Sequence, residues 1–96
     1  QIRKYIGLLE DEVILVGDFN STPEAGEIMY MERELKEAAK EMGKEDLYTF
    51  VARDGARERI DYIFLSPEIA VSDVYTIESD ASDHLPLVAD IGIKDI

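Results

Sequence analysis

The chain has 96 residues, and its 22 acidic and 10 basic side chains give a formal net charge of −12 at pH 7. This length fits one small domain, and 46% apolar with 33% charged residues is a globular balance rather than a disordered one. The excess of carboxylates argues against a protein that coats nucleic acid through a broad basic surface, because phosphate contacts need Lys and Arg.

The sequence excludes several other classes of protein. There is no cysteine, so disulfides and thiolate chemistry are excluded. No apolar run is long enough to cross a bilayer, and no signal-peptide pattern opens the chain. We therefore expect no membrane span and take a cytoplasmic origin as the default.

The first half of the chain predicts a strand followed by a helix. Residues 1–9 are typical of the end of a helix, so we expect a piece of a longer protein. The apolar run at residues 13–16 predicts a strand buried on both faces. Ser21, Pro23 and Glu24 offer a capped helix start, and an apolar stripe predicts a helix over residues 27–42. Gly43 is a suitable stop.

The second half predicts strands. Residues 47–52 and 59–65 have strand composition, with Asp54 and Gly55 as the turn between them. Further strands are expected at residues 71–77 and 87–93. The order of one strand, one helix and four strands predicts an α+β-like or mixed α/β domain over residues 1–96, with one main helix and an apolar face that needs a cover.

Asp18 and Asn20 follow the first predicted strand and lie two residues apart, so they point to the same side. Ligands of α/β sheets bind at the carboxyl ends of strands. A carboxylate beside an amide can hold a nucleophilic water and donate a hydrogen bond to a developing oxyanion. The alternative is that both residues only serve turn chemistry.

Asp61 interrupts an apolar strand. It shares a face with Ile63 and Leu65, where an ionised carboxylate is costly unless it is paired. An exposed edge position, or a bond to Arg59, is the alternative to a functional role.

His84 is the only histidine, and Asp83 precedes it. A carboxylate bonded to one imidazole nitrogen fixes the tautomer and leaves the other nitrogen for water or phosphate, and Asp61 is the natural candidate for this carboxylate. A histidine in a surface loop is more often inert. A serine hydrolase that uses Ser82 or Ser21 with His84 is disfavoured, because the chain has no nucleophile elbow.

Three blocks occur in a fixed order: Val-Gly-Asp-Phe-Asn at 16–20, Arg-Ile-Asp-Tyr-Ile-Phe at 59–64 and Ser-Asp-His-Leu-Pro at 82–86. Together they resemble the C-terminal half of the endonuclease/exonuclease/phosphatase superfamily. That superfamily includes pancreatic-type deoxyribonuclease, abasic-site endonucleases, sphingomyelinases and inositol-polyphosphate phosphatases. The resemblance spans the whole chain.

The resemblance implies a role for each candidate residue. Asp18 is similar to the family's acid that activates water or the leaving group, and Asn20 to its companion at the phosphate. Asp61 is similar to the carboxylate that orients the catalytic His84, and Asp83 to an additional metal-site acid. Mg²⁺ or Mn²⁺ and in-line hydrolysis of a phosphate ester follow from the resemblance.

The resemblance also implies a fold and a partner. The family fold is a four-layer α/β/β/α sandwich, of which this chain would form one half with a mixed sheet. The family's principal metal ligand is a glutamate in the N-terminal half, and Glu10 and Glu12 only lead into the first predicted strand. We therefore expect the chain to pair with an N-terminal half or with a second copy of itself.

Two functions are consistent with these features. The first is a phosphodiesterase or phosphatase half-domain that acts on phosphate esters, nucleic acid among them, once it is completed. The second is an inactive interaction or scaffold module that keeps the fold. Residues 44–58 contain only Lys44, Arg53 and Arg57 as cations, which favours a small phosphodiester over duplex DNA.

Overall fold

A computed structural model describes residues 13–92 of the protein. The elements in chain order are β1 (Ile14–Asp18), α2 (Gly26–Met31), β2 (Lys36–Glu37), α3 (Ala38–Glu41), β3 (Phe50–Val51), β4 (Arg57–Glu58), β5 (Asp61–Leu65), β6 (Ala70–Thr76) and β7 (Leu87–Gly92). The chain is mixed α/β, as its sequence predicts. The predicted helix end at residues 1–9 lies outside the described residues.

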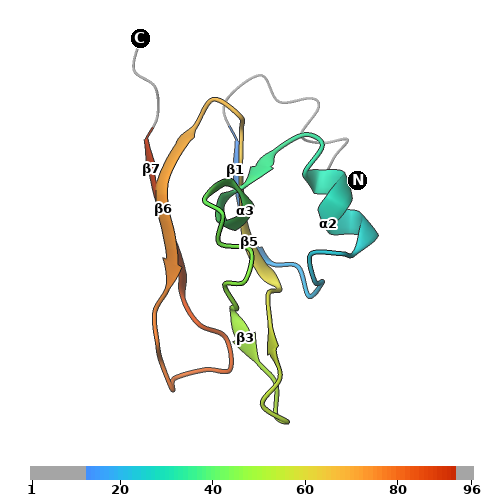
Figure 1. Ribbon diagram of the computed structural model, residues 1–96, viewed down its shortest axis with the longest axis vertical. Coiled ribbons are helices and arrows are strands. Elements are labelled where there is room, and N and C mark those ends of the chain that lie inside the picture. Colours follow the sequence, from blue (N-terminus) through green and yellow to red (C-terminus); the bar gives the residue numbers. More distant parts are fainter. Residues whose placement is uncertain (1–12, 93–96) are drawn as a thin grey trace.

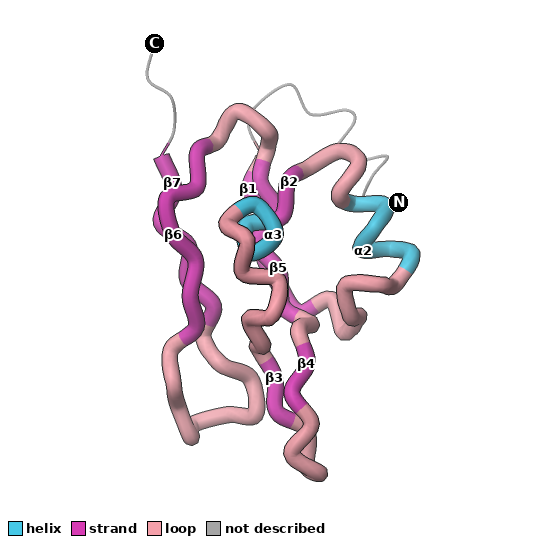
Figure 2. The backbone as a smooth tube through the Cα atoms, viewed as in Figure 1, coloured by secondary structure: helices cyan, strands magenta, loops and turns pink. Residues whose placement is uncertain are grey.

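The strands form three small sheets. β5 is the centre of the largest, with β1 on one side and β2 on the other, while β3 pairs with β4 and β6 pairs with β7. All of these pairs are antiparallel, whereas a mixed sheet was expected. The β6–β7 ribbon runs alongside the central strands, with α3 between them in the view and α2 at the opposite side (Figures 1 and 2).

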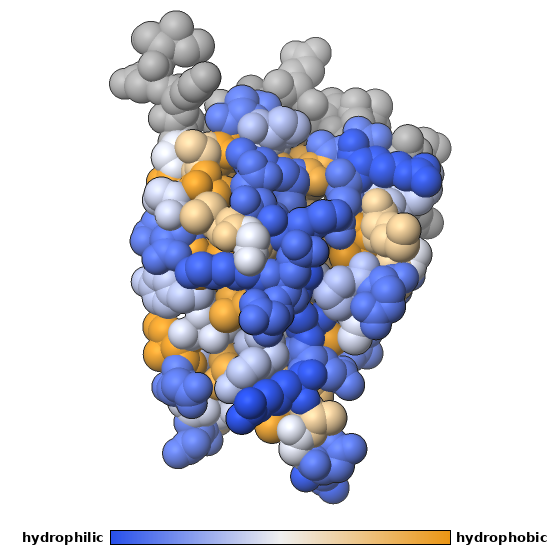
Figure 3. All heavy atoms as spheres, viewed as in Figure 1, coloured by the Kyte–Doolittle hydropathy of each residue, from blue (hydrophilic) through white to orange (hydrophobic). Residues whose placement is uncertain are grey.

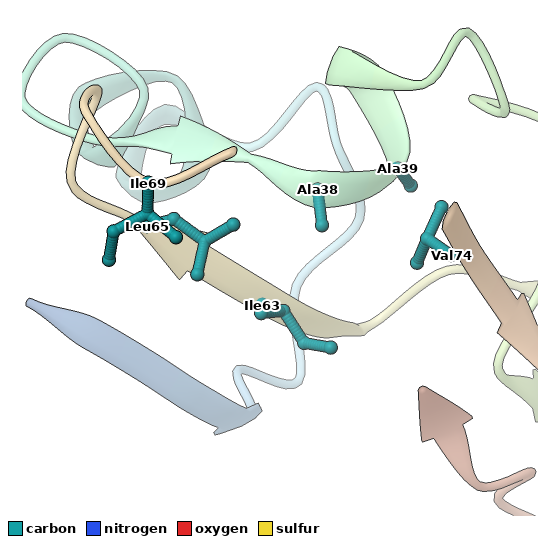
Figure 4. Close-up of a cluster of buried hydrophobic side chains, with 6 residues drawn as sticks. All are labelled: Ala38, Ala39, Ile63, Leu65, Ile69 and Val74. Atoms are coloured by element: carbon teal, nitrogen blue, oxygen red, sulfur yellow. The ribbon is translucent and has the colours of Figure 1, made fainter. Parts of the chain in front are cut away.

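Both faces of β5 are buried, and each face belongs to a different core cluster. Tyr62 and Phe64 pack with residues from α2 and the turn after it, namely Ile28, Met31 and Leu35. Ile63 and Leu65 face the other way and pack with Ala38, Ala39, Ile69 and Val74, as Figure 4 shows. β5 therefore joins the two clusters through its two-residue alternation.

The single helix expected over residues 27–42 is wrong. Two short helices occupy this range, with a turn and the strand β2 between them. The predicted stripe is buried as expected, but Ile28, Met31 and Leu35 enter one cluster and Ala38 enters the other. Because the clusters lie on opposite faces of β5, no straight helix could reach both. Gly43 has a φ of 69°, in agreement with its predicted role as a helix stop.

The capped helix start predicted at Ser21 is also wrong. α2 begins at Gly26, and its N-cap residue Ala25 makes no side-chain cap. The Ser21 hydroxyl donates instead to Oε1 of Glu27, at 2.5 Å. The Ser21 side chain therefore makes a hydrogen bond of the kind that a cap would make, but this bond connects the loop after β1 to α2 and does not begin a helix.

Glu37 and Arg59 form a buried ion pair, with side chains only 2% and 8% exposed. Glu37 also caps α3, because its carboxylate accepts the backbone N–H groups of Ala39 and Lys40. The Arg59 guanidinium lies over the Tyr62 ring, 5.4 Å from its centroid. Arg59 is thus committed to Glu37 and to the core, and not to Asp61 as one interpretation of the sequence allowed.

β1 is not buried on both faces. Leu15 packs against the α2 cluster, but Ile14 and Val16 are 47% and 60% exposed. By register they lie on the same face as Leu65 and Ile63, which α3 and β6 cover. Because α3 follows β2 on the far side of β5, it does not extend over β1, and this face of β1 stays open among the described residues.

Strands are present in the second half where they are predicted, with two differences. Only Phe50–Val51 of the predicted strand 47–52 is a strand (β3), and the Asp54-Gly55 turn joins it to β4 rather than to the strand predicted at 59–65. β3 and β4 form a hairpin whose turn contains Gly55 at φ 87°, the conformation that the Asp54-Gly55 signal predicts. The strand predicted at 59–65 begins two residues later, as β5. β6 and β7 match the strands predicted at 71–77 and 87–93, with residue 93 outside the described residues.

Polar side chains dominate one broad face. They cover the middle of this face over α3, and apolar residues show mainly over the β6–β7 ribbon (Figure 3).

No helix in residues 13–92 is long and apolar enough to cross a bilayer.

Replacing Glu37 with Ala should strongly destabilise the fold. The change leaves the buried Arg59 guanidinium without its partner and removes the cap of α3. Breaking a buried ion pair from one side costs about 3–5 kcal/mol. The free energy of unfolding, measured by urea titration, should fall by an amount of this size.

Glu32 provides the matched control. It pairs with Lys40, whose side chain is 56% exposed, and such surface pairs contribute less than about 1 kcal/mol. Glu32→Gln should therefore leave the urea midpoint almost unchanged. Equal losses in the two variants would show that burial of the Glu37–Arg59 pair is not what matters.

Candidate functional site

The end of β1 and the start of β5 bring two carboxylates together. Asp18 is the last residue of β1 and Asp61 the first of β5, and the antiparallel register places them directly opposite each other. Directly opposite residues point to the same face of a sheet. Phe19 continues the pairing with a 2.9 Å backbone bond to Ile60, which fixes the strand ends.

His84 reaches this pair from the loop before β7. Its Nδ1 lies 2.8 Å from Oδ2 of Asp61. Because an ionised carboxylate can only accept, Nδ1 carries the proton and donates to Asp61. His84 is the partner that the position of Asp61 in an apolar strand requires, and the contact predicted between these two side chains is present.

The second imidazole nitrogen faces Asp18, with 3.6 Å between Nε2 and Oδ2 of Asp18. The ring thus lies between two carboxylates that would otherwise repel each other across the strands. The hydrogen bond to Asp61 is the main cause that raises the pKa of His84 above its usual range, opposed by partial burial and reinforced by the charges of Asp61, Asp18 and Asp83.

Asn20 adopts a left-handed backbone conformation, with φ 49°. Asparagine tolerates this region better than most residues. The backbone N–H of Asn20 donates to Oδ1 of Asp18, at 2.7 Å. Asp18 therefore serves the turn as well as the cluster, and the Asn20 side chain is exposed beside it.

The remaining candidates lie further out. Asp83 is exposed, and its carboxylate accepts a bond from the Ser82 hydroxyl. That hydroxyl also accepts the backbone N–H of His84, and the Ser21 hydroxyl donates to Glu27. Neither serine makes a described bond to the imidazole, so the structure gives no support to a serine hydrolase arrangement.

Several residues that support the site were not singled out from the sequence. The Phe50 ring packs against the His84 ring at 4.9 Å between centroids. The buried Tyr62 hydroxyl donates toward the carbonyls of Ser21 and Arg59, which tie the loop after β1 to the start of β5. Burial raises the pKa of Tyr62 well above its usual range, so it remains a neutral donor. In the sequence these aromatics look like ordinary strand formers.

One group of possible metal ligands stands out among residues 13–92. Asp18, Asp61 and His84 each offer a ligand atom, and these atoms lie within 4.8 Å of one another. Two carboxylates are the oxygen donors that Mg²⁺ and Mn²⁺ prefer, with water filling the other positions. The residues therefore fit a divalent cation, but they do not identify which one. Asp83 is not part of this group and stays a prediction as a metal ligand.

The Asp61–His84 pair should be visible in the titration of the single histidine. Asp61→Asn removes the main cause of the raised His84 pKa, so the pKa should fall toward 6.5. NMR titration of the ring protons measures this directly. Asp90→Asn, an exposed change on β7, is the control and should leave the titration unchanged.

The same pair links stability to pH. Because the folded-state pKa of His84 lies above the unfolded value, its stabilisation is fully present below about pH 6.5 and is lost as the pH rises through the raised pKa. The stability difference between the wild type and His84→Gln should therefore shrink from pH 5 to pH 8. A difference that grows over this range would contradict the assignment.

The comparisons with known proteins agree with the geometry. A sequence model described as the endonuclease/exonuclease/phosphatase family matches residues 4–84, which include Asp18, Asp61 and His84. Searches of curated proteins and of solved structures found no match. The family consists of nuclease- and phosphatase-type hydrolases that generally depend on a metal ion. The match covers most of the chain, and this protein belongs to the endonuclease/exonuclease/phosphatase family.

Proposed function

We propose that this protein hydrolyses phosphate esters with Mg²⁺ or Mn²⁺, using Asp18, Asn20, Asp61 and His84 as its catalytic residues. The observation that carries the proposal is the placement of the His84 ring between Asp61, at 2.8 Å, and Asp18, at 3.6 Å. This cluster joins the ends of two strands to a loop far along the chain. Family membership supports the same class of chemistry.

His84 is arranged to move or hold a proton. With Nδ1–H bonded to Asp61, the neutral ring keeps a lone pair on Nε2 that can accept a proton from water. The protonated ring instead presents Nε2–H to a phosphate oxygen. Asp61 stabilises the protonated form and fixes the tautomer, which is the role of the orienting carboxylate in acid–base sites.

Asp18 and Asn20 complete the reacting surface. Oδ1 of Asp18 accepts the backbone N–H of Asn20, while Oδ2 faces His84. The free lone pairs of Oδ2 suit either a water or a cation. The exposed Asn20 side chain can donate from its amide to a phosphate oxygen, which carries negative charge through the reaction.

A divalent cation would be held chiefly by Asp18, with Asp61 beside it. Bound there, it would supply positive charge to a phosphate oxygen and lower the pKa of a bound water. Asp83 is exposed next to His84 and is the nearby acid that would add a further carboxylate to the cation.

We also propose that the chain forms the C-terminal half of a family domain and is completed by an N-terminal half or a second copy. Ile14 and Val16 support this, because they are exposed on the same face of β1 as Asp18. Exposed apolar side chains beside a polar cluster often mark a surface that another element covers. A face-to-face arrangement would cover them and enclose the cluster.

The charge of a hollow that lies near the loop after β1, and that Asp18, Asp61 and His84 do not line, favours a small phosphodiester as substrate. An open hollow of about 460 Å³ lies next to the loop after β1, and its charged lining residues are Glu24, Glu45, Asp46, Glu58, Arg57 and Arg59. Carboxylates outnumber the cations, so the hollow does not suit a nucleic-acid backbone. A short ester that places one phosphate at Asp18 and His84 avoids this repulsion.

His84→Gln and Asp18→Asn should each lower the hydrolysis of bis-p-nitrophenyl phosphate with Mg²⁺ or Mn²⁺. Loss of a general acid or base costs about 10²–10⁴-fold in rate. Release of p-nitrophenolate measures it, with Asp90→Asn as the control outside the cluster. Absence of turnover in every form of the protein, including the completed one, would favour the inactive scaffold module instead.

Completion of the domain by a second copy predicts self-association. At micromolar concentration, size-exclusion chromatography with light scattering should give the mass of a dimer rather than that of the 10.9 kDa chain. Val16→Lys, which places a charge on the exposed face of β1, should restore the monomer. A well-folded monomer of the unchanged protein would exclude the second copy and leave an N-terminal half as the partner.

A further inference from the structure

The contact between Asp61 and His84 is made by residues 23 positions apart, yet one short segment holds both of them. That segment is residues 49–51, which includes β3. It lies between the start of β5, at Asp61, and the loop that carries His84. Thr49 is at its start and has a fully buried side chain.

Thr49 is bonded to the start of β5 through its side chain. Its Oγ1 accepts the backbone N–H groups of Ile60 and Asp61, each at 3.1 Å. The backbone N–H of Thr49 donates to the carbonyl of Glu58, at 2.9 Å. A hydroxyl is needed here, because the buried N–H group of Ile60 and the partly buried N–H group of Asp61 use a side chain rather than a strand as their acceptor.

The same segment holds the His84 loop from both sides. The carbonyl of Thr49 accepts the N–H of Leu85, at 2.8 Å, and the N–H of Val51 donates to the carbonyl of Asp83, at 2.9 Å. These bonds flank His84, which forms an isolated antiparallel bridge with Phe50. The Phe50 ring then lies against the imidazole. The backbone of His84 thus has a fixed position relative to Thr49.

We propose that Thr49 is a positioning residue that sets Asp61 against His84, with its hydroxyl holding the aspartate and its carbonyl holding the histidine loop. The functional meaning of this role rests on the proposed hydrolysis, because only an acid–base histidine needs a fixed tautomer. The positioning of Asp61 and His84 by Thr49 does not depend on that hydrolysis. Thr49 touches neither substrate nor cation and acts only through the pair.

Thr49→Val is the direct test, because valine keeps the shape of threonine and removes only the hydroxyl. The readout is the tautomer of the single histidine, measured from the ¹⁵N shifts of the ring in metal-free buffer above its titration. The wild type should show the Nδ1–H form that Asp61 imposes. The variant should lose that signature in favour of Nε2–H, the form that free histidine prefers, and kcat should fall with little change in KM.

Val74→Ala is the matched control. Val74 is fully buried in the other core cluster and contacts neither Asp61 nor His84 in the described structure. Its loss should lower stability while the Nδ1–H signature remains. A folded Thr49→Val variant with the wild-type tautomer would overturn the proposal, and so would a Val74→Ala variant that changes the tautomer to the same extent.

Thr49→Ser keeps the test decisive if the valine variant does not fold. Serine retains a hydroxyl but lacks the methyl group that fixes its rotamer. Amide exchange at Ile60 and Asp61 reports the two bonds, and the ¹⁵N shifts report the tautomer. The proposal requires these readouts to be retained together or lost together, and a change in one alone overturns it. Absent turnover in the wild type would refute the hydrolysis while leaving the tautomer result intact.

Discussion

Burial of β5 on both faces is the constraint on which the rest of the structure depends. On one face of β5, Tyr62 and Phe64 pack against α2, and on the other face Ile63 and Leu65 pack against α3 and β6. A strand with two buried faces can carry a charge only at its end. Asp61 is at that end, and this is why the same strand that organises the core also delivers a carboxylate to the site. Its partial burial is tolerated because its carboxylate accepts the Nδ1–H of His84.

The site follows from how other segments attach to that strand. β1 pairs with β5 in a register that places Asp18 opposite Asp61, and Thr49 connects the start of β5 to the His84 loop. The loop after β6 and the β3–β4 hairpin reach the same end of the molecule (Figure 1). Three distant parts of the sequence therefore meet at one point among the described residues.

The polar residues of the site were more predictable than the path of the backbone. Asp61 in an apolar strand, and a lone histidine beside an acid, each predict a need for a partner, and the structure makes them partners. The prediction of one helix over residues 27–42 failed because a stripe of apolar residues has the same spacing whether it enters one core cluster or two. The prediction that Ile14 and Val16 are buried failed for a similar reason, since an apolar run does not show which of its faces another element covers. Thr49 gave no signal at all, because a threonine in a strand is common and its hydroxyl acts only through contacts distant in sequence.

The antiparallel register of β1 has a consequence for folding. A shift of one residue would turn Asp18 toward the α2 core, and a shift of two would carry it roughly 7 Å away from Asp61. A cation that bridged Asp18 and Asp61 would bind only the native alignment. It would therefore stabilise that alignment more as its concentration rises, and the supply of the cation would help decide how the first described strand is paired.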